Sequence, residues 1–258
     1  MIKNYYIAKV AVSQCTADIR INDVPIFRKS VDGDLTTELP INHHIEFSGI
    51  QEFSVTIRPL YGNAAFLSGE KCEVEIWRYD GSESKIVPLE QMCAGSLIVG
   101  EAEVMLPFKQ YNQVFAADVS CPISRWNDCI EIKDSRKVGP AVAAFFKKFG
   151  QTMADKQYSQ YMEFVREREV KICRALLLGE EEVSKRNKML FDFLNQGFVL
   201  QPLTGGKRLQ LYAHNRVVTV LDKDYGPSLK FVNEDTDQAL RIELLLGFKK
   251  GHVDLSVI

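Results

Sequence analysis

The chain has 258 residues, of which 46% are hydrophobic and 26% are charged, and its formal net charge is −2 at pH 7. This composition is typical of a globular protein with a substantial core and excludes a globally disordered chain. The near-neutral charge lacks the basic excess that nucleic acids and anionic membrane surfaces attract, so we expect neither as a partner.

The N-terminal residues and the cysteines predict a cytoplasmic protein. Lys3 and Lys9 interrupt the apolar residues that a signal peptide would need, and no apolar run approaches the ~20 residues that span a bilayer. A long chain without an export signal does not need disulfides, so we expect free thiols. The cysteines are Cys15, Cys72, Cys93, Cys121, Cys129 and Cys173.

The first half of the chain shows the alternation of apolar and polar residues that is typical of β-strands. Residues 19–26 predict a hairpin, because Asn22 and Asp23 tolerate the positive φ angles of a tight turn. Residues 53–58 and 72–77 alternate as half-buried strands do. Successive strands without helices between them predict an antiparallel β-sandwich of the jelly-roll type.

The β pattern continues to about residue 136. Residues 85–87 and 97–106 are expected to be further strands, the second of which ends at Pro107. The hydrophobic period then becomes helical. We therefore predict a β-sandwich domain over residues 1–136 and an α+β domain over residues 137–258.

The second half predicts three helices followed by a β-meander. The helices are expected over residues 142–149, 158–178 and 181–195, with Gly150 as the stop of the first. Gly205-Gly206 is expected to turn the chain within the meander. The expected strands cover residues 198–200, 209–213, 216–221, 229–232, 239–248 and 253–258. The fold class is therefore α+β, with a helical segment packed on an antiparallel sheet.

Two stretches resemble known families. Residues 19–26, together with Ile41-Asn42, Ile45, Gly49 and residues 53–57, resemble the opening of galactose-binding-like jelly-roll domains over about forty residues. That resemblance implies a sandwich and a possible sugar ligand. The helix-then-meander order of the second half looks like the cone-shaped α+β folds of the nuclear-transport-factor-2-like type. This second resemblance implies a pocket between helices and sheet.

Segments that resemble well-known catalytic or metal-binding motifs lack residues that those motifs require. Residues 205–208 lack the first glycine and the hydroxyl of a phosphate-binding loop. Residues 222–233 resemble a calcium loop but have Asn233 where the bidentate carboxylate belongs, so residues 222–226 predict a β-turn. His43 and His44 are neighbours and would point to opposite faces of a strand. We therefore expect no catalytic residue, no metal site and no cofactor.

Two groups of residues are candidates for binding. Glu73, Glu75, Trp77 and Tyr79 alternate along one predicted strand and share one face. Carboxylates beside aromatic rings are typical of sugar-processing sites and of protein interfaces, and they also occur on ordinary solvent-facing strips. The second group is expected to line a pocket in the C-terminal domain. It consists of Tyr161, Arg168 and Tyr212.

Three classes of function remain open. The first is a non-catalytic interaction protein, such as an adaptor or an immunity-type partner of another bacterial protein. The second is a carbohydrate-binding jelly-roll protein. The third is an enzyme with a pocket between the helices and the sheet of the C-terminal domain. The absent motifs favour the first class, in which another protein is the partner and a sugar or another small molecule is the alternative ligand.

Overall fold

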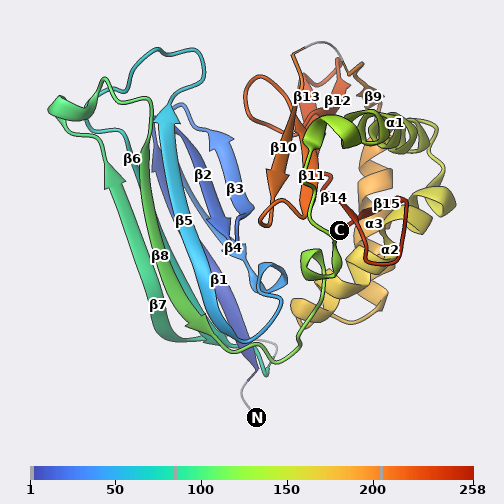
Figure 1. Cartoon of the computed structure of the whole chain (residues 1–258), viewed down its shortest axis with the longest axis horizontal. Coiled ribbons are helices and arrows are strands. Elements are labelled where there is room, and N and C mark those ends of the chain that lie inside the picture. The colour runs from blue at the N-terminus through green and yellow to red at the C-terminus, as the bar shows by residue number, and fades with distance from the viewer. Residues whose placement is uncertain (1–2, 84–85, 204–205) are drawn as a thin grey trace. The chain divides into compact units, whose positions relative to one another are not determined.

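The computed structural model describes residues 3–83, 86–203 and 206–258 (Figure 1). The chain divides into two compact units, Met1–Ile123 and Ser124–Ile258, which we call the N-terminal and the C-terminal unit. The boundary expected near residue 136 lies inside the C-terminal unit. Residues 124–136 pack with that unit, because Cys129 forms a β-bridge with Lys249 and the N–H of Ile132 donates to the carbonyl oxygen of Asn215.

The N-terminal unit contains eight antiparallel strands in two four-stranded sheets, with the orders β4-β1-β6-β7 and β3-β2-β5-β8. This confirms the predicted antiparallel sandwich. The strands are β1 (Asn4–Ser13), β2 (Cys15–Ile21), β3 (Val24–Ser30), β4 (Asp34–Pro40), β5 (Gly49–Pro59), β6 (Lys71–Asp80), β7 (Val87–Ile98) and β8 (Lys109–Ala117).

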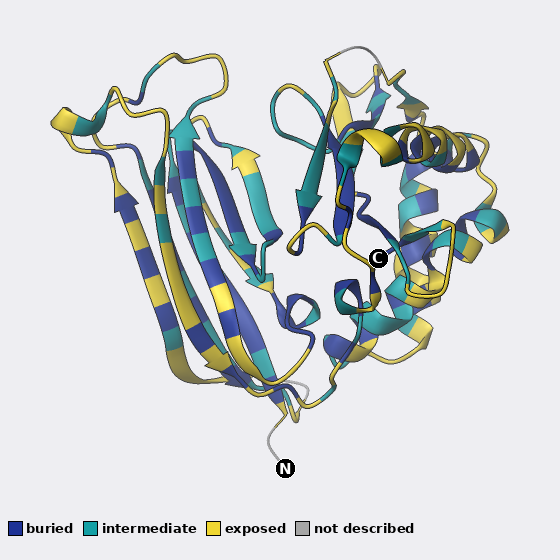
Figure 2. Ribbon diagram, viewed as in Figure 1, coloured by how far each residue is buried: buried dark blue, intermediate teal, exposed yellow. Residues whose placement is uncertain are grey.

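One hydrophobic core lies between the two sheets. Alternate residues of most strands point into it, and Figure 2 shows the resulting bands of buried and exposed residues. Tyr6 on β1 and Phe115 on β8 meet across the sandwich, with their ring centroids 6.5 Å apart. The core therefore joins residues that are more than a hundred positions apart in the sequence.

The predicted hairpin is confirmed, and one predicted strand is wrong. Asn22 and Asp23 adopt φ angles of 51° and 59° between β2 and β3. The strand expected over residues 97–106 ends at Ile98, and a short 3-10 helix, Glu101–Glu103, follows. The side chain of Glu103 caps the N-terminus of this short helix, because its carboxylate accepts a hydrogen bond from the N–H of Gly100 at 2.9 Å. Of the strand expected over residues 85–87, Lys85 lies outside the described residues.

The described residues of the C-terminal unit form three helices and two antiparallel sheets, which confirms the α+β class. The sheet orders are β10-β11-β14-β15 and β13-β12-β9. The elements are α1 (Ser135–Ala154), α2 (Tyr158–Ala175), α3 (Glu181–Leu194), β9 (Val199–Leu200), β10 (Arg208–Tyr212), β11 (Val217–Leu221), β12 (Leu229–Asn233), β13 (Gln238–Ile242), β14 (Leu246–Phe248) and β15 (Leu255–Val257). Among the described residues, no helix is long and apolar enough to cross a membrane.

The helices and sheets of the C-terminal unit share a core rich in aromatic side chains. Phe149 on α1, Tyr161 on α2 and Phe191 on α3 form a chain of rings, with centroid distances of 5.6 Å and 5.0 Å between successive rings. Tertiary packing of apolar faces is what stabilises helices of this length in proteins. The three helices are therefore fixed by one shared aromatic contact region.

Gly150 does not end the first helix, so that prediction is wrong. Helix α1 runs through Gly150 to Ala154, and Gly150 is buried. A Cβ at Gly150 would lie 2.9 Å from Leu229 Cδ1 on β12, which is too close for ordinary packing. The glycine thus permits the close approach of α1 to the sheet.

Two predicted turns lie in the meander. The turn over residues 222–226 is confirmed, because the N–H of Asp222 donates to the carbonyl oxygen of Gly226 at 2.9 Å. The carboxylate of Asp224 accepts two hydrogen bonds from Arg241, so it supports the turn as an ion pair. The expected turn at Gly205-Gly206 falls partly outside the described residues, because Gly205 is not among them.

Candidate functional site

The predicted strip on β6 lies on the outer face of the β4-β1-β6-β7 sheet. Glu73, Glu75 and Trp77 are partly exposed, while the residues between them face the core. Tyr79 differs, because only 7% of it is exposed. The strip therefore presents one accessible aromatic side chain, Trp77, rather than the pair that the sequence suggested.

Neighbouring charged side chains hold the indole of Trp77 in place. Its Nε1–H donates a hydrogen bond to Glu75 Oε2 at 2.7 Å. The ammonium group of Lys9 on β1 lies 4.9 Å from the centre of the indole ring, within the range of a cation–π interaction. Glu73 is paired with Lys71, with 3.2 Å between Lys71 Nζ and Glu73 Oε2. Trp77 is therefore pre-organised on the surface.

An open hollow of about 430 Å³ lies on the same sheet face, next to these charged residues. The hollow forms because the outward side chains in the middle of this face are short, whereas those around it are longer. The short side chains come from three strands and are Ala11, Thr36, Ala94 and Ser96. Strand pairing sets them beside the strip, since Ala11 and Ser96 both pair with Glu73, and Ala94 pairs with Glu75.

The charge on this face is predominantly acidic. Among the described residues of β1, β4 and β6, its outward carboxylates outnumber its outward ammonium groups by four to two. The carboxylates belong to Asp34, Glu38, Glu73 and Glu75, and the ammonium groups to Lys9 and Lys71. Such an imbalance favours ligands or partner surfaces that carry positive charge.

The three residues expected to line a pocket in the C-terminal unit lie elsewhere. Tyr161 is 2% exposed and donates a hydrogen bond to Asn187 Oδ1 at 2.9 Å, and burial raises its pKa to about 12. Tyr212 is fully buried. Arg168 donates to the buried Glu169 at 3.0 Å. All three therefore belong to the core or to an internal ion pair, and none lines the pocket described next.

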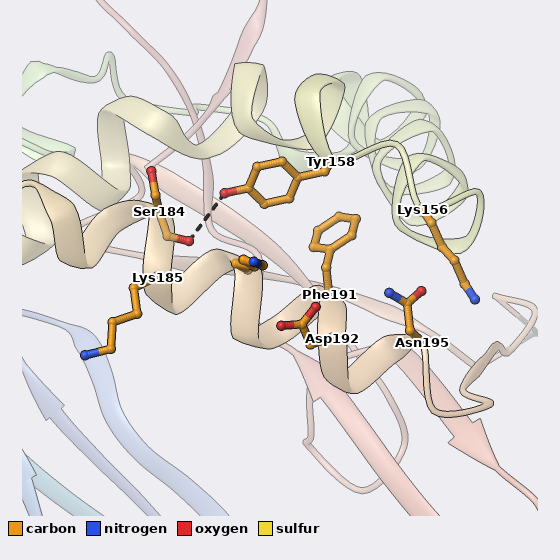
Figure 3. Close-up of a pocket in the computed structure, with 8 residues that line it drawn as sticks. Lys156, Tyr158, Ser184, Lys185, Phe191, Asp192 and Asn195 are labelled. Atoms are coloured by element: carbon orange, nitrogen blue, oxygen red, sulfur yellow. Dashed lines mark hydrogen bonds between the residues drawn. The ribbon is translucent and has the colours of Figure 1, made fainter.

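A pocket of about 520 Å³ lies between the start of α2 and the length of α3 (Figure 3). Tyr158 and Phe191 contribute aromatic rings to its wall, and Lys156 and Asn195 lie together at one end. Sequence reasoning missed this pocket, because its two sides are separated by 26 or more positions in the chain.

The cysteines and the metal-binding residue types were the remaining candidates for reactive groups. All six cysteines are free thiols, as predicted. Burial raises the pKa of Cys15, Cys72 and Cys93 to about 12, so these thiols stay protonated and are poor nucleophiles. In the part of the chain that the structure describes, no three His, Cys, Asp or Glu side chains gather into a metal site.

Comparisons with known protein families, with curated proteins and with solved structures find no match to this chain. The two family resemblances noted in the sequence therefore stay expectations. The geometry of the two units is what remains to support a function.

Proposed function

We propose that the chain is a non-catalytic protein-interaction protein that binds its partner through the outer face of the β4-β1-β6-β7 sheet. The pre-organised, partly exposed Trp77 is the observation that carries this proposal. Tryptophan is enriched among the residues that contribute most to protein binding, and a fixed ring loses little conformational entropy on binding. The polar side chains around it correspond to the rim of such an interface.

The acidic excess of this face indicates the chemistry of the partner. A partner with a basic surface would be attracted to Glu73 and Glu75 and steered onto Trp77. Rim charges act mainly on the association rate, and salt screens that effect. An adaptor or an immunity-type protein, which works by occupying another protein, fits such a surface.

The proposal is tested by affinity capture with variants in native extract, followed by measurement of the dissociation constant of the partner. We expect Trp77→Ala to weaken binding of that partner at least tenfold and Glu73→Lys/Glu75→Lys to slow its association. Val114→Ala is the matched control, because Val114 is 55% exposed on β8, in the other sheet. A specific partner that binds the Trp77 variant as tightly as the wild type would refute the proposal.

Carbohydrate binding is the second candidate, and the hollow favours it. The hydroxyls of Thr36 and Ser96 and the carboxylates of Glu73 and Glu75 surround a space of about 430 Å³, and Trp77 donates a hydrogen bond to Glu75 in its lining. These groups can form hydrogen bonds with sugar hydroxyls. Titration with monosaccharides and disaccharides, followed by Trp77 fluorescence, distinguishes the two candidates. Saturable sugar binding that Ser96→Phe abolishes would favour the second.

A further inference from the structure

The pocket between α2 and α3 has an aromatic wall. The rings of Tyr158 and Phe191 stand edge to face, with an interplanar angle of 90° and centroids 5.2 Å apart. Phe191 is only 5% exposed, and the Tyr158 hydroxyl donates to the backbone oxygen of Ser184 at 3.4 Å (Figure 3). Tyr161 packs behind Phe191. The wall is therefore well packed, and the half-buried ring of Tyr158 is the part of it that a flat apolar group can reach.

The mouth of the pocket is positively charged. Three lysines line it, whereas Asp192 is its one lining carboxylate. Lys185 is paired with Glu182 at 3.0 Å. Within the described residues, the ammonium groups of Lys156 and Lys188 have no ion-pair or hydrogen-bond partner. Two cations are thus available to a ligand beside an apolar wall.

The backbone places Lys156 directly after the end of α1. Lys156 has a φ of 57°, a left-handed conformation that is uncommon for a residue other than glycine. Its N–H donates to the carbonyl oxygen of Met153 at 3.1 Å, and its carbonyl oxygen accepts from Tyr158 at 3.0 Å. These bonds stabilise the short connection between α1 and α2, from which Lys156 projects beside Asn195 (Figure 3). A left-handed residue at this position is a common way for a helix to end.

We propose that this pocket binds a small aromatic anion, namely a planar ring that carries a phosphate or carboxylate group. The ring would lie against Tyr158, which Phe191 supports from behind. The flexible side chains of Lys156 and Lys188 would rotate toward the anionic group. Most ligand sites combine an apolar wall with a few polar groups that set orientation, and a volume of about 520 Å³ lies in their usual range. This site belongs to the C-terminal unit and does not depend on the proposed protein interface of the N-terminal unit.

Calorimetric titration of the full chain with a panel of small molecules tests the proposal. The panel contains adenosine monophosphate and phosphotyrosine, which carry both ring and phosphate, and benzoate, which carries ring and carboxylate. Adenosine and inorganic phosphate are the controls that lack one of the two features. We expect at least one aromatic anion to bind tenfold or more tightly than both controls. The tightest binder of the three shows which type of ring and which anionic group the pocket prefers.

Variants locate the binding. Lys156→Gln/Lys188→Gln should weaken binding of the best aromatic anion at least tenfold, and Asp192→Asn should tighten it. Lys137→Gln is the matched control, because Lys137 is an exposed lysine at the other end of α1. Ser184→Trp, which fills the pocket, should abolish binding while the thermal unfolding temperature stays within a few degrees. Absence of binding by all three aromatic anions at millimolar concentration, equal binding of inorganic phosphate, or full binding by the double lysine variant would overturn the proposal.

Discussion

The indole nitrogen of Trp77 lies 2.7 Å from Glu75 Oε2, two positions earlier on the same face of β6. A neutral N–H that donates to an ionised carboxylate forms a stronger hydrogen bond than a neutral pair does. The bond restricts the rotation of the indole, while Lys9 approaches its face from β1. One hydrogen bond within the strand and one contact across the sheet thus determine how the surface aromatic is presented.

The first prediction concerns the mobility of Trp77. Glu75→Ala removes the acceptor, so we expect stronger acrylamide quenching of Trp77 fluorescence in this variant than in the wild type. The other tryptophan, Trp126, is only 3% exposed and should contribute little to quenching. Trp77→Phe is the control, since it should remove the accessible component of the emission. Unchanged quenching in Glu75→Ala would show that the hydrogen bond does not restrain the ring.

The second prediction compares two glycines of α1. Alanine favours a helix over glycine by about 1 kcal/mol, but Gly139 precedes Pro140, whose ring disfavours a helical residue with a Cβ before it, so Gly139→Ala should change the free energy of unfolding by less than about 1 kcal/mol. Gly150→Ala should instead lower the free energy of unfolding by about 1–3 kcal/mol, because its Cβ meets the buried Leu229. Denaturant unfolding measures both. Equal effects of the two substitutions would contradict the role given to Gly150.

The third prediction concerns Glu70, which is only 2% exposed. Burial raises its pKa above the usual 4.5, and the backbone of Leu67 partly offsets this effect. A raised pKa means that the folded state binds the proton more tightly than the unfolded state does. Ionised Glu70 therefore destabilises the fold at neutral pH, and this cost disappears as the pH falls from the raised pKa toward 4.5.

Glu70→Gln should accordingly raise the free energy of unfolding at pH 7. Its advantage over the wild type should shrink as the pH falls through the raised pKa and disappear below 4.5, because Glu70 is then protonated in both states. Chemical unfolding at several pH values measures this difference. A glutamine variant that is less stable than the wild type at pH 7 would show that ionised Glu70 is stabilised by groups around it.

The fourth prediction concerns Glu167, whose ionised form stabilises the fold, whereas ionised Glu70 destabilises it. Lys249 and then Lys171 hold the pKa of Glu167 on α2 at about 2, well below its usual 4.5. The ionised form therefore stabilises the fold above pH 4.5, and this contribution is lost as the pH falls toward 2. Because 58% of the Glu167 side chain is exposed, we expect it to be worth less than about 1 kcal/mol.

Glu167→Gln tests this expectation. The variant should be slightly less stable than the wild type at pH 7 and equal to it near pH 2. High salt should reduce the difference at pH 7, since screening weakens exposed ion pairs. A difference that grows as the pH falls would contradict the assignment.

The sequence determined those parts of the fold that follow from local periodicity. The side-chain period of two placed Glu73, Glu75 and Trp77 on one face of β6, because successive residues of a strand point to opposite sides. The helical period located α2 and α3 to within a few residues. Asn22-Asp23 specified its own turn, because the required positive φ angles are a local property of the backbone.

Only the tertiary structure decided what surrounds those residues. Strand order brought Ala11 and Ser96 beside β6 and Thr36 one strand further away, and strand order depends on pairings between distant parts of the chain. In the sequence, Gly150 is interpreted as the end of a helix. The tertiary structure shows instead that Gly150 lies where α1 packs against Leu229 of β12. In the same way, the α2–α3 pocket exists because Tyr158 of α2 contacts Phe191 of α3. A contact between two helices cannot be predicted from the hydrophobic periodicity of either helix.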